Sequence, residues 1–205
     1  MHDCSCGVVK MKLHYPILIS GFIGSGKSTL AKKLAKHYRM KYVSASSIHH
    51  KLVLDRMQKE KKNAKNIQDG FWESEAGKKG TAMRAKDLNI DKEVDRRLLK
   101  TLHAKPRAVT DARLMPWLYK QKAIRIWLSA PENTRAKRVG ERDHLPTKKV
   151  LSSIRSRMKT DRGIFWKLYK IDMGKDFTPF DLVINNDKIE TQQTFRIVKT
   201  YIDAH

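Results

Sequence analysis

The sequence predicts an α/β protein in which a five-stranded parallel sheet is covered by helices. Three observations support this fold class. Short apolar runs of strand length alternate with longer segments whose apolar residues recur at helical spacing. The first apolar run leads directly into a glycine-rich turn and then a helical segment. The chain has 205 residues, 40% of them hydrophobic, which is enough for one domain with a buried core.

The order of the elements follows from these patterns. Strands are expected at short runs rich in isoleucine, leucine and valine, namely residues 17–20, 41–43, 108–110, 124–128 and 182–184. Helices are expected between the strands and after the last one, namely at about residues 27–38, 47–57, 91–102, 131–142, 147–169 and 191–202. Residues 59–80 are rich in lysine, asparagine and glycine, and we expect a loop-rich or partly helical insertion there, with Phe71 and Trp72 embedded in it.

The glycine-rich turn carries the most specific pattern in the chain. Residues 21–28 match G-x-x-x-x-G-K-[ST] between a predicted strand and a predicted helix. Glycines allow successive backbone N–H groups to turn toward a phosphate, and the following helix directs its positive dipole end at the same anion. The pattern predicts a P-loop kinase or NTPase in which Lys27 reaches the β- and γ-phosphates of ATP. The predicted ATP-binding residues are Gly21, Phe22, Ile23, Gly24, Ser25, Gly26, Lys27, Ser28 and Thr29.

Charge and composition restrict the possible location and function of the protein further. Lysine and arginine number 44 against 21 acidic residues, a formal net charge of +23, so non-specific contact with nucleic acid is expected. No stretch reaches ~18 consecutive apolar residues, and the N-terminus lacks the long apolar segment of a signal peptide. We therefore expect a cytoplasmic protein without a membrane span. The base-specificity motif N-K-x-D of G proteins is absent, which favours a small-molecule kinase.

A basic region precedes the last predicted strand. Residues 134–175 contain 13 lysines and arginines against 4 acidic residues. A mobile lid over transferring phosphoryl groups would have this character, because it supplies positive charge to the transition state and excludes water.

Several segments, in order along the chain, carry a family resemblance. They are GFIGSGKSTLAKKLA, KYVSASSI, IDKEVDRR, DARLMPWL, RIWLSAPENTRAKRV, YKID and FDLVINN. Together they resemble the phosphate loop, monophosphate-binding lobe, pre-lid helix and C-terminal elements of the archaeal type of cytidylate kinase, within the nucleoside monophosphate kinases. The resemblance covers about residues 15–202.

The resemblance implies a polar N-terminal extension over residues 1–14 and one P-loop kinase domain over residues 15–205. Within that domain it implies a monophosphate-binding lobe at about residues 44–104 and a short lid at about residues 140–170. The implied enzyme is a transferase of pyrimidine metabolism. It passes the γ-phosphoryl group of ATP to CMP or dCMP, giving ADP and CDP or dCDP, with Mg²⁺ as cofactor, and it is expected to be a monomer.

Roles for the phosphoryl-transfer residues follow from the resemblance and from side-chain chemistry. Arg157 and Arg162 are predicted lid arginines that spread over the transferring phosphoryl oxygens. Asp161 lies four residues after Arg157 and is expected to hold it when the lid is open. Ser28 and Asp111, which follows the third strand, are the predicted Mg²⁺ ligands, Asp111 acting either directly or through water.

The acceptor is expected to lie between the lobe and the turn after the third strand. Arg113 is predicted to fork onto its phosphate, and Asp95 and Arg96 to contact its cytosine or ribose. Where the family has an arginine after the second strand this chain has His50, with Lys51 as a possible replacement. A protonated His50 binds phosphate more strongly than a neutral one, so slightly acid pH is expected to favour acceptor binding.

Two alternatives remain open at the level of sequence. The histidine at position 50 and the unusual insertion over residues 59–80 are consistent with a P-loop kinase that has a different acceptor. The net charge of +23 is consistent with an RNA- or ribosome-associated ATP-binding protein of the same fold.

Overall fold

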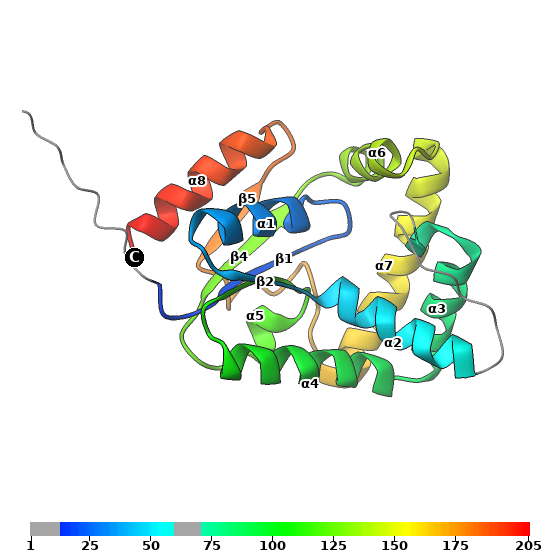
Figure 1. Ribbon diagram of the computed structural model, residues 1–205. Coiled ribbons are helices and arrows are strands. Elements are labelled where there is room, and N and C mark those ends of the chain that lie inside the picture. The colour runs from blue at the N-terminus through cyan, green and yellow to red at the C-terminus, as the bar shows by residue number, and fades with distance from the viewer. Residues whose placement is uncertain (1–12, 60–70) are drawn as a thin grey trace, which may run out of the picture.

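A computed structural model describes residues 13–59 and 71–205 (Figure 1). Its five strands form one parallel sheet in the order β2-β3-β1-β4-β5. They are β1 (Ile17–Gly21), β2 (Lys41–Ser44), β3 (Ala108–Asp111), β4 (Ile124–Ser129) and β5 (Leu182–Asn185). Each lies where the sequence predicts a strand, so the expected fold class is confirmed.

The helices form layers around this sheet. In Figure 1, α1 (Lys27–His37) and α8 (Thr191–Asp203) lie on one face, and α4 (Asn89–Ala104) and α5 (Met115–Leu118) lie on the other. Four more helices extend beyond the carboxyl ends of the strands: α2 (Ala45–Lys59), α3 (Glu75–Lys86), α6 (Glu132–Asp143) and α7 (Thr147–Tyr169). Over residues 13–59 and 71–205, no helix is long and apolar enough to cross a membrane.

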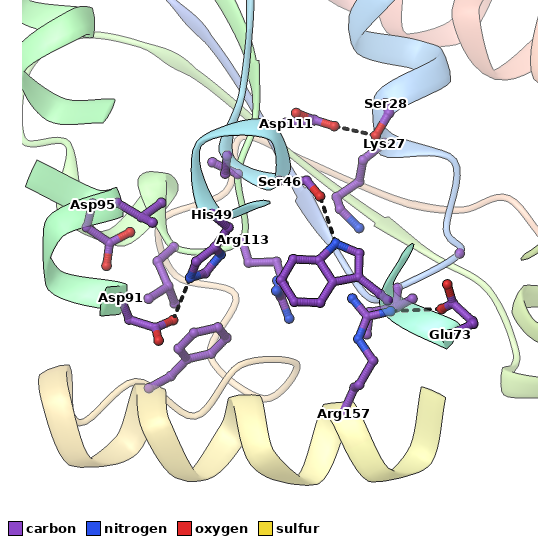
Figure 2. Close-up of a pocket in the computed structure, with 18 of the residues that line it drawn as sticks. Lys27, Ser28, Ser46, His49, Glu73, Asp91, Asp95, Asp111, Arg113 and Arg157 are labelled. Carbon is purple, nitrogen blue, oxygen red and sulfur yellow. Dashed lines mark hydrogen bonds and ion pairs between the residues drawn. The ribbon is translucent and has the colours of Figure 1, made fainter. Parts of the chain in front are cut away.

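The strand register places functional groups at one edge of the sheet. Asp111, the last residue of β3, pairs with Ile19 of β1 on one side and with Ser44 of β2 on the other. The glycine-rich loop begins where β1 ends, at Gly21. In parallel sheets ligands bind beyond these carboxyl ends, and the side chains drawn in Figure 2 gather there.

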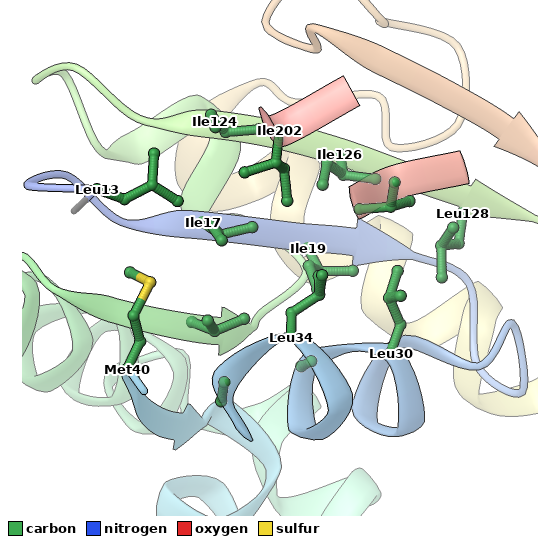
Figure 3. Close-up of a cluster of buried hydrophobic side chains, with 14 of the residues drawn as sticks. Leu13, Ile17, Ile19, Leu30, Leu34, Met40, Ile124, Ile126, Leu128 and Ile202 are labelled. Carbon is green, nitrogen blue, oxygen red and sulfur yellow. The ribbon is translucent and has the colours of Figure 1, made fainter. Parts of the chain in front are cut away.

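Burial on both faces explains the apolar strand composition. Successive strand residues point to opposite faces, so Ile17 and Ile19 pack toward α1 and α8, whereas Leu18 packs toward α4 and α5. Figure 3 shows the first of these clusters, in which Leu30 and Leu34 of α1 and Ile202 of α8 meet the sheet. A parallel sheet covered in this way needs apolar residues at nearly every strand position.

The main departure from the predicted elements lies in the insertion over residues 59–80. Residues 60–70 lie outside the described part of the chain, but a 3₁₀ turn, Phe71–Glu73, and helix α3 follow. The hydroxyl of Ser74 caps α3 by accepting the N–H of Gly77 at 3.2 Å. Helix α3 has little apolar periodicity, which is why the sequence indicates only partial helix here. The short helix α5 is also missing from the predicted elements, whereas the predicted bounds of α7 are confirmed.

Candidate active site

The phosphate loop joins β1 to α1 with three glycines at positive φ. Gly21, Gly24 and Gly26 have φ values of 140°, 79° and 92°. A Cβ on Gly24 would lie 2.6 Å from the backbone oxygen of Arg135, so the loop and α6 approach too closely for a side chain. Helix α1 starts at Lys27, and its unpaired N-terminal N–H groups and dipole make this turn suited to a phosphate.

Two side chains outside the loop brace it. Arg135 of α6 donates from Nη1 to the backbone oxygen of Ile23 at 2.9 Å, and its guanidinium lies 5.2 Å from the ring centroid of Phe22. Asn186, after β5, donates from Nδ2 to the backbone oxygen of Ser25 at 2.9 Å. Both residues lie within segments that carry the family resemblance, but the sequence does not show that they brace the loop, because this role depends on contacts across more than 100 residues.

Lys27 is the cation at the start of α1. Its Nζ donates to the backbone oxygen of Phe22 at 2.6 Å. Burial and, to a smaller extent, the positive charge of Arg113 lower the pKa of Lys27, whereas Asp111 opposes the shift; the resulting pKa is about 7. A phosphate beside this group would restore the ammonium form, because the anion compensates both effects.

Ser28 and Asp111, the predicted metal ligands, lie side by side. The Ser28 hydroxyl donates to Oδ2 of Asp111, and Oδ1 of Asp111 is buried without a partner among the described residues. Burial raises the pKa of Asp111, while the Ser28 hydroxyl and Lys27 lower it. Hydroxyl and carboxylate oxygens are the donors that Mg²⁺ prefers, and an unpartnered carboxylate oxygen fits a cation or its water shell.

A buried ionic network lies on the acceptor side. Arg113 pairs with Asp161 of α7, and Asp161 also contacts Arg84 of α3 at 2.9 Å. Arg84 forks onto Asp91 of α4 at 2.7 and 3.1 Å, and Nε2 of His49 lies 3.3 Å from the same carboxylate. Burial alone would raise the pKa values of the two aspartates, but the arginines hold them below the ordinary range, with His49 adding to the effect on Asp91.

Arg157 of α7 lies nearby and makes its hydrogen bond to Glu73. Its Nη1 donates to Oε1 of Glu73 at 2.9 Å, and its guanidinium lies 5.1 Å from the ring centroid of Trp72. Asp161 pairs with Arg84 and Arg113, and its negative charge also acts on Arg157. Burial lowers the pKa of Arg157, while the charges of Asp161 and Glu73 oppose that shift. The predicted role of Asp161 in holding Arg157 when the lid is open remains a prediction.

Asp95 of α4 is buried at the inner end of the site. It accepts a hydrogen bond from the hydroxyl of Tyr169 at 2.9 Å. Burial raises the pKa of Asp95 to about 7; Asp91 adds to the shift, while Tyr169, Arg113 and Arg84 oppose it. A carboxyl group in this condition can donate a proton in a hydrogen bond at neutral pH.

Most of these groups line one cavity of about 150 Å³ (Figure 2), but Arg84 and Asp161 of the ionic network are not part of its lining. Lys27 of α1, Arg113 after β3 and Arg157 of α7 line it together with two residues of α2: Ser46, beside Trp72, and His49, beside Asp91. Eight of the predicted site residues line the cavity: Ile23, Gly24, Lys27, Ser28, Asp95, Asp111, Arg113 and Arg157. Cavity residues that the sequence analysis did not single out include Ser46, His49, Trp72, Glu73, Asp91 and Phe165.

Nine predicted residues are not part of the lining of this cavity: five in the phosphate loop (Gly21, Phe22, Ser25, Gly26 and Thr29) and four on the acceptor and lid side. The His50 ring lies against Phe71 with ring centroids 4.2 Å apart, and burial lowers the pKa of His50. Lys51 is exposed on α2. Arg96 is exposed and pairs with Glu93, and Arg162 is exposed and pairs with Asp172 at 3.0 Å. Their predicted roles remain predictions.

Two further cavities adjoin the site. One, of about 290 Å³, lies beside the phosphate loop and includes Gly26, Thr29, Arg138 and Asn186. Arg138 donates from Nη1 and Nη2 to the side-chain and backbone oxygens of Asn186 at 3.0 and 2.7 Å. The other, of about 570 Å³, lies between α3 and α7 and shares three side chains with the central cavity: Trp72, Glu73 and Arg157.

Solved structures share this fold at low sequence identity. A protein from Eubacterium ventriosum superposes with a TM-score of 0.59 and 19% identity, over 93% of this chain and 99% of that one. A shikimate kinase from Bacteroides thetaiotaomicron superposes with a TM-score of 0.51 and 13% identity, over 92% of this chain and 98% of that one. Likeness at this identity extends to the fold alone.

Sequence comparison is more specific. The chain is 34% identical over 187 residues to a cytidylate kinase of Pyrococcus horikoshii, covering 91% of this chain and 88% of that protein. It is 32% identical over 188 residues to a cytidylate kinase of Sulfurisphaera tokodaii, covering 91% and 94%. A model of the cytidylate kinase-like family matches residues 16–188. These matches confirm the resemblance carried by the ordered motifs, and the chain therefore belongs to the cytidylate kinase-like family.

Proposed function

We propose that this protein is a nucleoside monophosphate kinase that transfers the γ-phosphoryl group of ATP to CMP or dCMP. The family membership supports the reaction. One structural observation supports the site: Lys27 of the phosphate loop, Arg113 after β3 and Arg157 of α7 converge on one cavity. Three cations around one small space suit two phosphate groups that must be brought together against their own repulsion.

ATP lies on the phosphate loop, with Lys27 at its β- and γ-phosphates. The adjoining cavity of about 290 Å³ lies next to Gly26 and takes the adenosine, with Arg138 and Asn186 on its wall. Ser28 and Asp111 would hold Mg²⁺, which would neutralise part of the charge on the phosphates.

CMP lies on the opposite side of the cavity. Its phosphate is held by Arg113 and Arg157, which can donate two N–H groups to one phosphate. Its base extends toward Asp95, where a protonated carboxyl can donate to the ring nitrogen N3 and accept from the amino group. His50 lies outside the cavity, so the substitution there gives no reason to propose a different acceptor.

The chemistry is a direct in-line transfer. An oxygen of the acceptor phosphate forms a bond to the γ-phosphorus as the bond from that phosphorus to the bridging oxygen breaks, and its electron pair leaves on ADP. The acceptor oxygen is already anionic, so a strong general base is not needed. The chain's own contribution is positioning by Arg113 and charge stabilisation by Lys27 and Arg157.

ADP release with Mg-ATP and a panel of CMP, dCMP, UMP and AMP tests this function. We expect turnover with CMP or dCMP to exceed that with AMP by at least an order of magnitude, because Asp95 can pair with N3 and the amino group of cytosine. Turnover of none of the pyrimidine monophosphates, with ATP still bound, would exclude the proposal.

A further inference from the structure

Arg157 has open space on its outer side. The central cavity and the cavity of about 570 Å³ between α3 and α7 both reach its side chain, together with those of Trp72 and Glu73. A long arginine side chain beside such a space has several rotamers available, so packing alone does not determine where its guanidinium points. Specific contacts must therefore select the orientation that faces the phosphates.

Trp72 and Glu73 supply two such contacts from consecutive positions. Glu73 accepts from Nη1 of Arg157 at 2.9 Å, and Cζ of Arg157 lies over the Trp72 ring, 5.1 Å from its centroid. The indole is itself fixed, because Nε1 of Trp72 donates to the hydroxyl of Ser46 at 3.2 Å. A guanidinium held by both a carboxylate and an aromatic ring has fewer orientations open to it.

These contacts do not involve the Nε–H group of Arg157. Nε of Arg157 is buried and has no partner among the described residues, although Arg157 lines the cavity that holds Lys27 and Arg113. A buried cationic N–H without a partner is costly, so its presence points to a ligand that accepts from it. An anionic phosphate oxygen in this cavity is such an acceptor.

We propose that Trp72 and Glu73 are positioning residues that orient Arg157 toward the phosphoryl group in transfer. This inference rests on the proposed function, in which Arg157 stabilises the transferring group. The two residues belong to the turn before α3, whereas Arg157 belongs to α7, 84 positions away. Arg157 is therefore aligned only when residues 72 and 73 are in contact with α7. Phosphoryl transfer should then depend on this contact.

The charge state of Glu73 should make kcat depend on pH. Burial raises the pKa of Glu73, while Arg157 lowers it; from α6, Asp143 raises it and Arg142 lowers it. Protonation of Glu73 removes its charge and weakens its hold on Arg157. We therefore expect kcat to fall on the acid side at a pH above the ordinary glutamate range, while KM for ATP stays nearly constant.

The test compares Glu73→Ala and Glu73→Gln with the wild type. Glu73→Ala should lower kcat by about 10–100-fold, since a misoriented catalytic group loses that much. Glu73→Gln should recover most of this loss, because its amide oxygen still accepts from Nη1, and it should lack the acid-side fall in kcat. Glu75→Ala is the matched control: Glu75 is exposed two residues further on, pairs with Lys78, and should leave kcat unchanged.

A double-variant cycle identifies the residue through which Glu73 acts. Arg157→Ala should lower kcat by about 100-fold or more, and adding Glu73→Ala should lower it no further. A Glu73→Ala enzyme as fast as the wild type, or equal slowing with and without Arg157, would overturn the inference. If Glu73→Ala does not fold, as thermal unfolding would show, an unchanged acid-side fall in Glu73→Gln overturns it instead.

The same data separate this inference from the proposed function. A wild-type protein that transfers to none of the acceptors contradicts the proposed function itself. Full activity of Arg157→Ala contradicts the role given to Arg157 and removes the basis for the positioning role.

Discussion

At the level of a single residue, Lys27 supplies the positive charge that the phosphate loop offers to the transferring phosphoryl group. Among the described residues its side chain hydrogen-bonds to the backbone oxygen of Phe22 alone, so it contributes little to the fold. Lys27→Ala should therefore keep the thermal unfolding midpoint close to that of the wild type. It should lower kcat for transfer by at least about 100-fold, since a charge that stabilises the transition state is lost. Steady-state ADP release checks this, and near-full activity would show that the mechanism is wrong.

Asp95 makes acceptor binding depend on pH. The pKa of Asp95 is about 7, so the carboxyl is protonated below that pH and can donate to N3 of cytosine. The kcat/KM for CMP should fall as pH rises past about 7. Asp95→Asn carries a permanent N–H donor and should keep a flat profile over the same range. A wild-type profile that stays flat from pH 6 to about 9 would contradict this base contact.

The same shift affects stability with a defined sign. A folded pKa of about 7 lies above the ordinary aspartate value, so the folded protein binds more protons than the unfolded chain. The free energy of unfolding should fall as pH rises from about 4 to 7. Asp95→Asn should then be more stable than the wild type at pH 8, on the order of 1–3 kcal/mol. Urea unfolding checks this, with the exposed Asp55→Asn as control.

At the level of elements, the rotation of each helix about its axis decides which of its side chains face the cavity. His49 and Asp95 have buried side chains that line the cavity, whereas the next residue on each helix, His50 or Arg96, lies outside it. One position along an α-helix turns the side chain by about 100°. Sequence patterns locate a helix more reliably than its rotation, so the right segment can be named with the wrong neighbour.

The phosphate loop also depends on a distant turn. Gly174 has a φ of 92°, and a Cβ at this position would lie 2.3 Å from Cζ of Phe22 in the loop. Gly174→Ala should displace Phe22, raise KM for ATP, and lower the free energy of unfolding by about 1–3 kcal/mol. The matched control is Gly163→Ala on α7, where an added Cβ meets nothing within 4 Å.

Gly163→Ala should stabilise the protein by about 0.5–1 kcal/mol, because alanine loses less backbone entropy in a helix. Urea unfolding and ATP titration of both glycine variants provide the measurements. Equal effects of the two substitutions would show that contact with Phe22 is not what matters at position 174.

The buried ionic network joins three helices at the level of the whole molecule. Asp161 of α7 contacts both Arg84 of α3 and Arg113 after β3, and its side chain is fully buried. Asp161→Ala leaves two arginines without this partner, so the free energy of unfolding should fall by about 3–5 kcal/mol. Urea unfolding measures the change. Asp172 is only partly buried and pairs with the exposed Arg162 and Lys175, so Asp172→Ala should cost far less stability. A similar loss in both variants would refute the special role of the network.

At the same scale, the net positive charge should make the protein bind RNA in a salt-dependent way. With a formal charge of +23 the protein should retain RNA at about 50 mM salt and release most of it by about 200 mM, because each neutralised phosphate frees a counterion. We expect scrambled and natural RNA sequences to behave alike in filter binding. A clear preference for one sequence would instead support a specific RNA-linked role.

The sequence by itself determined the strands, most helices, the phosphate loop and the family. These features are local: an apolar run, a helical period or a glycine spacing is set by neighbouring residues and can be read without long-range contacts. Lys27, Ser28 and Asp111 belong to this group, since a loop after one strand and a carboxylate after its neighbour must share an edge of a parallel sheet.

Only the tertiary structure decided which side chains share the acceptor side. Glu73 meets Arg157 across 84 positions, and Asn186 reaches the phosphate loop across 161. Arg84 and Asp91 look like ordinary helical charges in the sequence, yet both are buried among α3, α4 and α7. Such pairings depend on the rotation and approach of whole helices. Packing of the complete core sets both, and no local pattern records them.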